Sequence, residues 1–277
     1  MQLVLAIDGG GTGCRAVLAD AAGCVLARAE GGPANIASDL AGSVRNLAAL
    51  CDAVLRGVDR ARCHVVMGLA GATVADSVAG VRAGLRFADL RIETDARIAV
   101  AGALQGADGI VVVLGTGSVF ACQRGGQVRV IGGRGLILGD EASGAWLGRG
   151  LVSMAVRAAD GVVAVTPLLG SVLAELGGVD GVVAFSLTAR PADFAEFAPR
   201  LIGSADPAAV ALLAQAEADI AASVAVLQAG AGLPVVFLGS LGLRIAGRFT
   251  DRWEVRAALG SGLDGALWLA LQDGSGG

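Results

Sequence analysis

The chain has 277 residues, of which 55% are hydrophobic and 17% charged, and its formal net charge is −4. This balance excludes an intrinsically disordered chain, and the absence of a Lys/Arg run argues against nucleic acid as a partner. All 21 basic residues are arginines and His64 is the single histidine, which excludes Walker A nucleotide sites and His-rich metal sites. The length predicts about two domains.

The first half of the chain alternates short apolar runs with helical stretches. Helices are predicted from a cap at Ser38 to about Leu55, over 73–85 and over 95–105. Continuous apolar strands are typical of sheets that are covered on both faces. The alternation therefore predicts an α/β architecture. The predicted strands are Leu3–Ile7, Cys14–Ala19, Val25–Ala29, His64–Leu69 and Leu90–Glu93.

The second half begins as the first does. An apolar strand, a glycine turn and a second strand are followed by a hairpin, at Ile110–Leu114, Val119–Gln123 and Val128–Ile131. A helical stretch at about 142–230, strands at Val235–Leu238 and Trp253–Arg256, and a closing helix at 263–272 complete the chain. This weak internal duplication predicts two sheets that each present a glycine turn. Two such lobes usually enclose a ligand cleft.

Cysteine usage and hydropathy bear on the compartment. The five cysteines have no CxxC spacing and are odd in number, which indicates reduced thiols in the cytoplasm. The N-terminal run lacks basic residues and reaches Asp8 too early for a signal peptide. The uncharged run from Ile220 to Leu243 is long enough to span a bilayer, but it contains Pro234 and four glycines. We therefore interpret it as the end of a helix followed by a buried strand, and expect no membrane partner.

The two glycine turns are the main chemical signal. Asp8-Gly9-Gly10-Gly11-Thr12-Gly13 and Gly115-Thr116-Gly117-Ser118 each follow a buried strand. Glycine backbone N–H groups can face an anion, and each threonine adds a hydroxyl donor. Asp8 can hold Mg²⁺ through water. Each turn alone can also be read as a tight hairpin turn without a ligand. The occurrence of two such turns predicts two loops that hold a triphosphate from both sides.

Three further motifs lie near predicted strand ends. Thr94-Asp95-Ala96 places a carboxylate where a helix begins, either as a helix cap or as a base for a substrate hydroxyl. The glycine-dense stretch from Gly132 to Gly144 leads into a helix and can offer backbone groups and Asp140 to sugar hydroxyls, or is an irregular loop. A small-residue turn at Gly239-Ser240 follows a buried strand, where a flat ring or ribose could approach the backbone.

In this order, the motifs beginning at Asp8, Thr94, Gly115 and Gly139 resemble those of the BadF/BadG/BcrA/BcrD ATPase family. Within that family the chain is most similar to N-acetylglucosamine and glucosamine kinases. The resemblance implies an α/β fold of two ribonuclease-H-like lobes, as in actin-like ATPases and sugar kinases, with a central ATP cleft. It implies lobes at 1–107 and 108–277, with the closing helix at 263–274 returning to the first lobe. Because family members commonly dimerise, it also implies a homodimer.

The resemblance also assigns roles to residues. Transfer of the ATP γ-phosphoryl group to the 6-hydroxyl of an amino sugar, N-acetylglucosamine or glucosamine, is the implied reaction, with Mg²⁺ held by Asp8 through water. Asp95 is the implied catalytic base and also binds the sugar. The implied phosphate and nucleoside residues are Asp8, Gly10, Gly11, Thr12, Gly115, Thr116, Gly117, Gly239 and Ser240. The implied sugar-binding residues are Asn35, Asp95, Ser118, Gly133, Arg134, Gly135 and Asp140.

Two departures and two rival functions accompany this resemblance. Arg134 stands where many relatives have tryptophan, which leaves the identity of the sugar open, and Ala142 stands where they often have glycine. One rival is an ATPase that activates a dehydratase through a shared iron–sulfur cluster, for which Cys122 alone offers too few thiolates. The other is a non-catalytic sugar or nucleotide sensor on the same fold, against which Asp95 and both phosphate turns argue.

Overall fold

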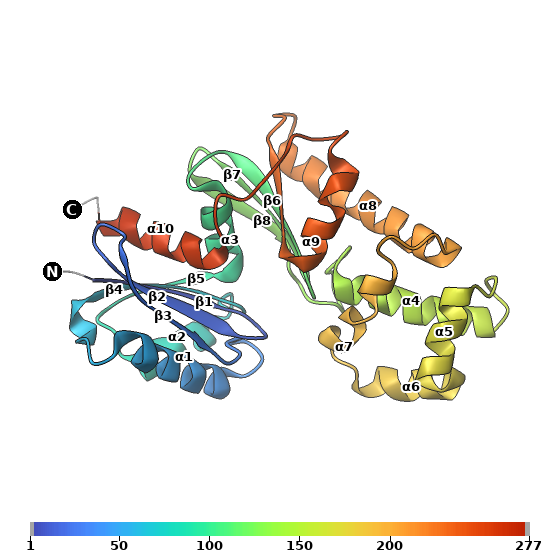
Figure 1. Cartoon of the computed structure of the whole chain (residues 1–277), viewed down its shortest axis with the longest axis horizontal. Coiled ribbons are helices and arrows are strands. Elements are labelled where there is room, and N and C mark those ends of the chain that lie inside the picture. Colours follow the sequence, from blue (N-terminus) through green and yellow to red (C-terminus); the bar gives the residue numbers. More distant parts are fainter. Residues whose placement is uncertain (1–2, 275–277) are drawn as a thin grey trace. The chain divides into compact units, whose positions relative to one another are not determined.

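The computed structural model describes residues 3–274 and divides them into two compact units (Figure 1). The first unit holds the chain through Asp108, together with Gln123–Val128 and the residues from Ala257 onward. The second unit holds Gly109–Cys122 and Arg129–Arg256. The short returning segment Gln123–Val128 is attached to the first unit by backbone and side-chain bonds, such as the Gly125 N–H donating to Asp108 Oδ1 at 2.8 Å.

The first unit contains a five-stranded mixed sheet in the order β3-β2-β1-β4-β5. The strand β1 pairs antiparallel with β2 and parallel with β4, and β4 pairs parallel with β5. Its strands are β1 (Leu3–Gly9), β2 (Cys14–Asp20), β3 (Val25–Gly31), β4 (Cys63–Leu69) and β5 (Asp89–Thr94). Its helices are α1 (Leu40–Leu55), η1 (Arg60–Arg62), α2 (Ala75–Leu85), α3 (Asp95–Leu104) and α10 (Gly262–Gly274).

The apolar run in β1 is continuous because both faces of this sheet are covered (Figure 1). Leu5 and Ile7 pack into a core with buried residues of α1 and α2. Val4 and Ala6 point to the opposite face and pack with residues of α3 and α10. Successive strand residues alternate between faces, so one short strand serves two cores.

The helices α3 and α10 approach closely at two glycines. A Cβ atom on Gly102 would lie 1.9 Å from the carbonyl oxygen of Ser261, and one on Gly265 would lie 1.9 Å from that of Ile98. Only residues without a side chain permit this backbone contact. The glycines thus allow the last helix to seal the second face of the sheet.

The second unit repeats the same strand order. Its sheet reads β10-β9-β6-β7-β8, which in chain order is the arrangement of the first sheet, and β6 pairs parallel with β9. Its strands are β6 (Gly109–Leu114), β7 (Ser118–Arg124), β8 (Gln127–Gly132), β9 (Val235–Leu238) and β10 (Val255–Arg256). The predicted duplication and α/β class are therefore confirmed.

Between β8 and β9 the chain forms a helical insertion and then returns to the sheet. The expected helical stretch at about 142–230 is divided into five α-helices and one 3₁₀ turn. These are α4 (Gly144–Ala159), α5 (Pro167–Leu176), α6 (Gly178–Thr188), α7 (Pro191–Ala195), η2 (Ala198–Arg200) and α8 (Pro207–Gln228). Two short elements, α9 (Gly239–Ile245) and η3 (Ala246–Phe249), follow β9.

Three local predictions were wrong. The cap of α1 is Asp39, whose side chain accepts a hydrogen bond from the Gly42 N–H, and not Ser38. The residues after β9 form helix α9 rather than a turn. The last strand, β10, contains only Val255 and Arg256.

The helix α8 is long and apolar enough to cross a membrane by length and composition, as is the bent pair α5 and α6 taken together. The buried residues of α8, among them Leu213, Ile220 and Val224, belong to the core of the second unit. Glu217, in the middle of the helix, pairs with Arg248. One side of α8 therefore packs on the core of the second unit, while residues such as Val210 and Val226 on its other side are exposed.

Candidate functional site

The first glycine turn joins β1 to β2 at the end of a buried strand. The Gly10 N–H donates to the carbonyl oxygen of Gly13 at 2.9 Å and closes the turn, and Thr12 lies exposed on it. Asp8 is the penultimate residue of β1, so the sheet fixes its backbone. Asp8 therefore lies at the strand end, and Gly10, Gly11 and Thr12 lie on the turn that follows it.

Arg15, in β2 directly after this turn, is a residue that the sequence prediction missed. It faces Asp8 across the β1–β2 pair, and its Nη2 atom lies 2.7 Å from Asp8 Oδ2. The Asp8 side chain is 18% exposed and the Arg15 side chain 52%. The signal was present in the sequence, because the two residues are opposite one another in the predicted hairpin.

Asp95 is the first residue of α3, directly after β5. Thr94 caps the helix by accepting from the Arg97 N–H, so the capping role expected as an alternative for Asp95 belongs to its neighbour. The Asp95 Oδ1 atom accepts from the Ala96 N–H at 2.8 Å. The pKa of the Asp95 carboxyl is raised, mainly because nearby protein atoms desolvate it, while the Ala96 bond opposes the shift and the negative charge of Asp8 adds to it.

Asn35 lies in the segment between β3 and α1. Its Oδ1 atom accepts from the N–H groups of Ala37 and Ser38, at 3.1 and 3.3 Å. This Asx-type turn orients the side chain and occupies its oxygen. The amide nitrogen of Asn35 makes no hydrogen bond with the described residues, so it remains a donor for a ligand.

The second glycine turn joins β6 to β7 and is held by the start of α4. The Gly144 N–H donates to the Gly115 oxygen at 2.8 Å, and the Ala145 N–H donates to the Thr116 oxygen at 3.1 Å. Helix N-termini carry unpaired N–H groups that need such acceptors. The turn is therefore placed by the helix, with Thr116 exposed.

Asp140 is buried beside this turn. Burial raises the pKa of its carboxyl above the usual value, and the backbone N–H groups of Ser118 and Gly135 oppose that shift. A Cβ atom on Gly117 would lie 2.9 Å from Asp140 Oδ2. Glycine at this position thus makes room for the carboxylate.

Ser118 presents an unsatisfied hydroxyl next to Asp140. Its Oγ atom is buried and has no hydrogen-bond partner in the described part of the chain. Buried hydroxyls of folded proteins are almost always hydrogen-bonded. Ser118 Oγ is therefore a buried group with a free donor and acceptor.

The loop from Gly132 to Ala142 has an unusual backbone. Gly132, Gly133 and Gly135 have positive φ, and so do Asp140 at 57° and Ala142 at 64°. Side chains other than glycine rarely adopt this conformation, and strain of this kind is concentrated at ligand sites. Gly133, Arg134, Gly135 and Asp140, all predicted to bind sugar, lie on this loop.

A pocket of about 300 Å³ lies within the second unit beside Gly115 and Thr116. Ser240, at the start of α9, lines it as well, so two groups predicted to bind nucleotide share one cavity. Gly239, with a φ of 82°, passes so close to Leu114 that a Cβ atom would lie 2.2 Å from its carbonyl oxygen. Glu196 and Arg244 also line the pocket, and their spacing in the sequence gave no signal.

The predicted residues thus form two sets, one in each unit. Asp8 to Thr12, Asn35 and Asp95 belong to the first unit, and the residues from Gly115 onward belong to the second. Residues 3–274 contain no cluster of three or more His, Cys, Asp or Glu side chains that could hold a metal.

Comparisons with known proteins identify relatives along the whole chain. A model of the BadF/BadG/BcrA/BcrD ATPase family matches residues 5–246. A glucosamine kinase of Vibrio cholerae is 32% identical, over 98% of this chain and 96% of that protein. An N-acetylmuramic acid/N-acetylglucosamine kinase of Clostridium acetobutylicum is 29% identical, over 58% of this chain and 55% of that protein.

Solved structures agree on the fold. A protein of Chromobacterium violaceum, named as a candidate N-acetylglucosamine kinase, has a TM-score of 0.89 and 33% identity, covering 98% of this chain and 99% of that one. A ROK family glucokinase of Streptomyces griseus, solved with glucose and AMPPNP, has a TM-score of 0.58 at 22% identity and covers 98% and 99%. The expected actin-like ATPase and sugar-kinase fold is confirmed.

Proposed function

This chain belongs to the BadF/BadG/BcrA/BcrD ATPase family, and from that premise we propose that it transfers the γ-phosphoryl group of ATP to the 6-hydroxyl of glucosamine or N-acetylglucosamine. The similarity to a glucosamine kinase over almost the full length of both chains supports amino-sugar kinase activity. The observation that carries the proposal is the position of Asp95, whose carboxyl also has a raised pKa. Asp95 follows Thr94, which lies level with Gly9 across β4, so it stands at the same end of the sheet as the first glycine turn. Such a carboxylate is suited to accept a proton from a sugar hydroxyl.

The nucleotide residues are proposed to act mainly through the backbone. Gly10, Gly11 and Thr12 would bind phosphate oxygens from the first unit, and Gly115, Thr116 and Gly117 from the second. Gly239 and Ser240 would face the nucleoside. Support comes from the pocket that Thr116 and Ser240 share. Phosphoryl transfer requires mostly positioning and charge stabilisation, which turns of this kind can provide without lysine.

The donor set around Asp8 fits Mg²⁺. This ion prefers oxygen ligands, retains several waters and is usually held by one or two carboxylates together with substrate phosphates. Asp8 offers a carboxylate whose charge also acts on Asp95. Mg²⁺ would neutralise phosphate charge, with Asp8 holding it through water. Arg15 pairs with Asp8 Oδ2, so the other carboxylate oxygen, Oδ1, would face a water of the ion.

The sugar is proposed to contact Asn35, Asp95, Ser118, Gly133, Arg134, Gly135 and Asp140. Asn35 would donate from its amide nitrogen, since its oxygen is occupied. Ser118 and Asp140 would bind hydroxyl groups, which would satisfy the unpaired Oγ atom. Asp95 would orient the 6-hydroxyl and take its proton as the oxygen attacks the γ-phosphorus, while ADP leaves.

The dehydratase-activator alternative receives no support from the cysteines. Cys122 is buried in the core of the second unit, among residues such as Ile110 and Leu151. A cluster ligand has to present its thiolate at the surface that two copies share. The non-catalytic alternative is separated from a kinase by the following experiment.

The test is release of ADP by the purified chain with ATP, Mg²⁺ and a panel of glucosamine, N-acetylglucosamine and glucose. We expect sugar-dependent release with an amino sugar. Asp95→Asn should lower kcat by at least about 10²-fold with its fold intact, because proton transfer by a positioned group contributes roughly that much. Asp76→Asn, which also removes an acid from the first turn of a helix in the first unit, serves as the matched control.

Either of two results would contradict the proposal. Absence of sugar-dependent ADP release would favour the sensor, and full activity of Asp95→Asn would remove its role as the base.

We also propose a homodimer in the cytoplasm. Val179, Val183 and Leu187 form an exposed apolar stripe at four-residue spacing along α6, which is the kind of surface that a second subunit covers. None of the five cysteines, all of which the structure describes, forms a disulfide bond, as is usual in a reducing compartment. Light scattering at the peak of a sizing column gives the oligomeric state.

A further inference from the structure

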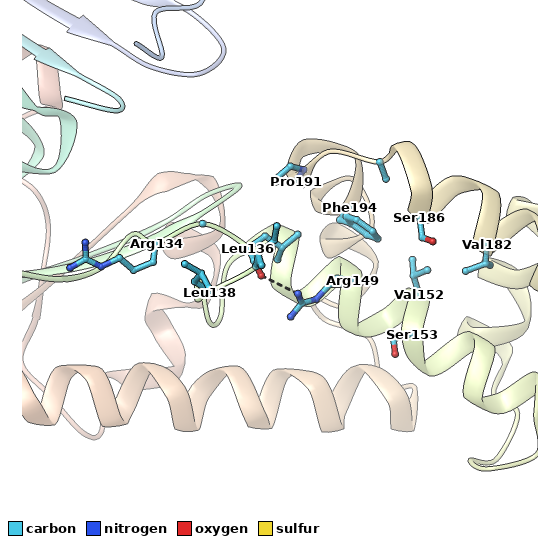
Figure 2. Close-up of a pocket in the computed structure, with 13 residues that line it drawn as sticks. Arg134, Leu136, Leu138, Arg149, Val152, Ser153, Val182, Ser186, Pro191 and Phe194 are labelled. Atoms are coloured by element: carbon cyan, nitrogen blue, oxygen red, sulfur yellow. Dashed lines mark hydrogen bonds between the residues drawn. The ribbon is translucent and has the colours of Figure 1, made fainter. Parts of the chain in front are cut away.

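A second cavity, of about 880 Å³, lies entirely within the second unit between the loop after β8 and the helical insertion (Figure 2). Its volume falls in the range of small-molecule sites, which are usually concave and mostly apolar. The principal wall residues are Leu136, Leu138, Val152, Val182, Pro191 and Phe194. None of the predicted nucleotide residues lines it, so this cavity is separate from the pocket beside Thr116, although Arg134 and Gly135 of the proposed sugar-binding residues line it.

The charged residues that line this cavity are all positive. Its lining contains Arg134 and Arg149 but no Asp or Glu. Figure 2 shows that Arg134 extends away from the other labelled side chains, whereas Arg149 reaches from α4 to the loop among the apolar walls. Arg149 Nη1 donates to the Leu136 oxygen at 3.0 Å, and no described carboxylate pairs with this guanidinium. Arg149 is therefore a cation with remaining donors beside an apolar cavity.

We infer that this cavity binds a small amphiphilic carboxylate, with its apolar body against Val152, Val182 and Phe194 and its carboxylate on Arg149. Apolar walls favour a hydrocarbon chain, because burial of each methylene group releases free energy. A guanidinium has five donors in a fixed geometry that matches a carboxylate, and Arg149 uses one of them on Leu136. A neutral chain would contact the walls but make no use of the remaining donors of the exposed Arg149.

Binding at this cavity would also reach the loop. Leu136 is the acceptor of Arg149 and lies between Gly135 and the exposed Ile137 and Leu138. A carboxylate bound to the remaining donors of Arg149 would share the guanidinium with the Leu136 oxygen. A bound ligand would thus contact, through Arg149 and Leu136, the loop that also carries Asp140. It would not contact the Asp140 carboxylate itself.

Isothermal titration calorimetry of the full chain with octanoate tests the inference, with 1-octanol as the neutral probe of equal chain length. Saturating N-acetylglucosamine is present in a parallel titration, so that a sugar-site ligand is recognised by competition. We expect octanoate to bind about tenfold more tightly than octanol, since charge-assisted hydrogen bonds are the stronger ones. We expect octanoate to bind in the presence of the sugar as well. No turnover is measured, so loss of kinase activity would not affect the result.

Variants assign the binding to the cavity. Arg149→Gln should reduce octanoate affinity to that of octanol and leave octanol binding unchanged. Ser153→Phe, at an exposed lining position, should weaken both probes by reducing the space. Arg157→Gln, on the same helix but outside the lining, is the matched control and should change neither. Equal affinity for the two probes, unchanged octanoate binding by Arg149→Gln, strict competition with the sugar, or no binding at all would each overturn the inference.

Discussion

At the scale of single residues, Asp95 carries a conflict between stability and function. Its carboxyl is desolvated and lies near the negative charge of Asp8, and both raise its pKa above the usual value of 3.8. A carboxylate that is more basic than usual is a better acceptor for a hydroxyl proton. The same environment makes the ionised side chain unfavourable in the folded protein.

Replacing Asp95 by asparagine should therefore stabilise the fold at neutral pH. Between the ordinary pKa and the raised one, the folded state binds more protons than the unfolded state, so stability falls as pH rises. Above the raised pKa the full cost of the charged form is present, and asparagine removes it. We expect Tm to increase by about 1–2 °C at pH 7, a small shift because Asp95 retains solvent access.

The difference should disappear below the ordinary aspartate pKa, where both proteins are neutral at this position. Differential scanning fluorimetry across pH measures it, and Asp76→Asn again provides the control. A lower Tm for Asp95→Asn at pH 7 would contradict this account.

At the scale of elements, the contact between α3 and α10 depends on two glycines. Gly265→Ala would place a methyl group against the Ile98 carbonyl, and the two helices would have to separate. Overpacking of this kind usually costs about 1–3 kcal/mol. Urea denaturation followed by the fluorescence of Trp268, which lies on α10, measures the change in the free energy of unfolding in a Trp146→Phe, Trp253→Phe background.

The control for this substitution is Gly170→Ala within α5 of the second unit, followed by the fluorescence of Trp253 in a Trp146→Phe, Trp268→Phe background. No atom lies within 4 Å of a Cβ atom at that position, so alanine should be neutral or slightly stabilising there because it favours helix. Equal effects of the two substitutions would show that close packing at Gly265 is unimportant.

The strands were predictable from sequence because each is a short apolar run bounded by turns. β1 and β6 are covered on both faces, so they are continuous apolar runs that can be recognised without an alternation of polar and apolar residues. The repeated order of strands followed from the two glycine turns. The helical insertion was less predictable. Much of it is apolar on every side, as in α8, where exposed alanines and valines weaken the amphipathic contrast that marks helix boundaries.

The position of a candidate residue was predictable where a motif lies next to a strand end, as at Asp8, Asp95 and Thr116. It was not predictable where tertiary structure supplies the neighbour. Arg244 reaches the pocket beside Thr116 only because β9 lies next to β6 in the sheet. Ala142 is buried and has a φ of 64°, a conformation that favours glycine, and nothing in its contacts explains why alanine stands there.

At the scale of the whole molecule, each of the two units has its own core, and the proposed substrates need residues of both. In the absence of ligands we expect the units to unfold separately. With N-acetylglucosamine and a non-hydrolysable ATP analogue near 100 times their Kd, each ligand should add about 2.7 kcal/mol, and the two transitions should merge.

Single-tryptophan variants make this measurable. A protein retaining only Trp268 reports the first unit, and one retaining only Trp253 reports the second. If the ligands raise the transition of one unit and leave the other unchanged, the proposed sharing of substrates between the units is wrong.

The return of the chain to its first sheet has a consequence for synthesis on the ribosome. The face of β1 formed by Val4 and Ala6 is covered partly by α10, and the whole of the second unit is translated before that helix. At about 5–20 residues per second, the roughly 150 intervening residues take about 8–30 s. For that time a growing chain carries an apolar sheet face without its final cover, which is the kind of surface that nascent-chain chaperones occupy.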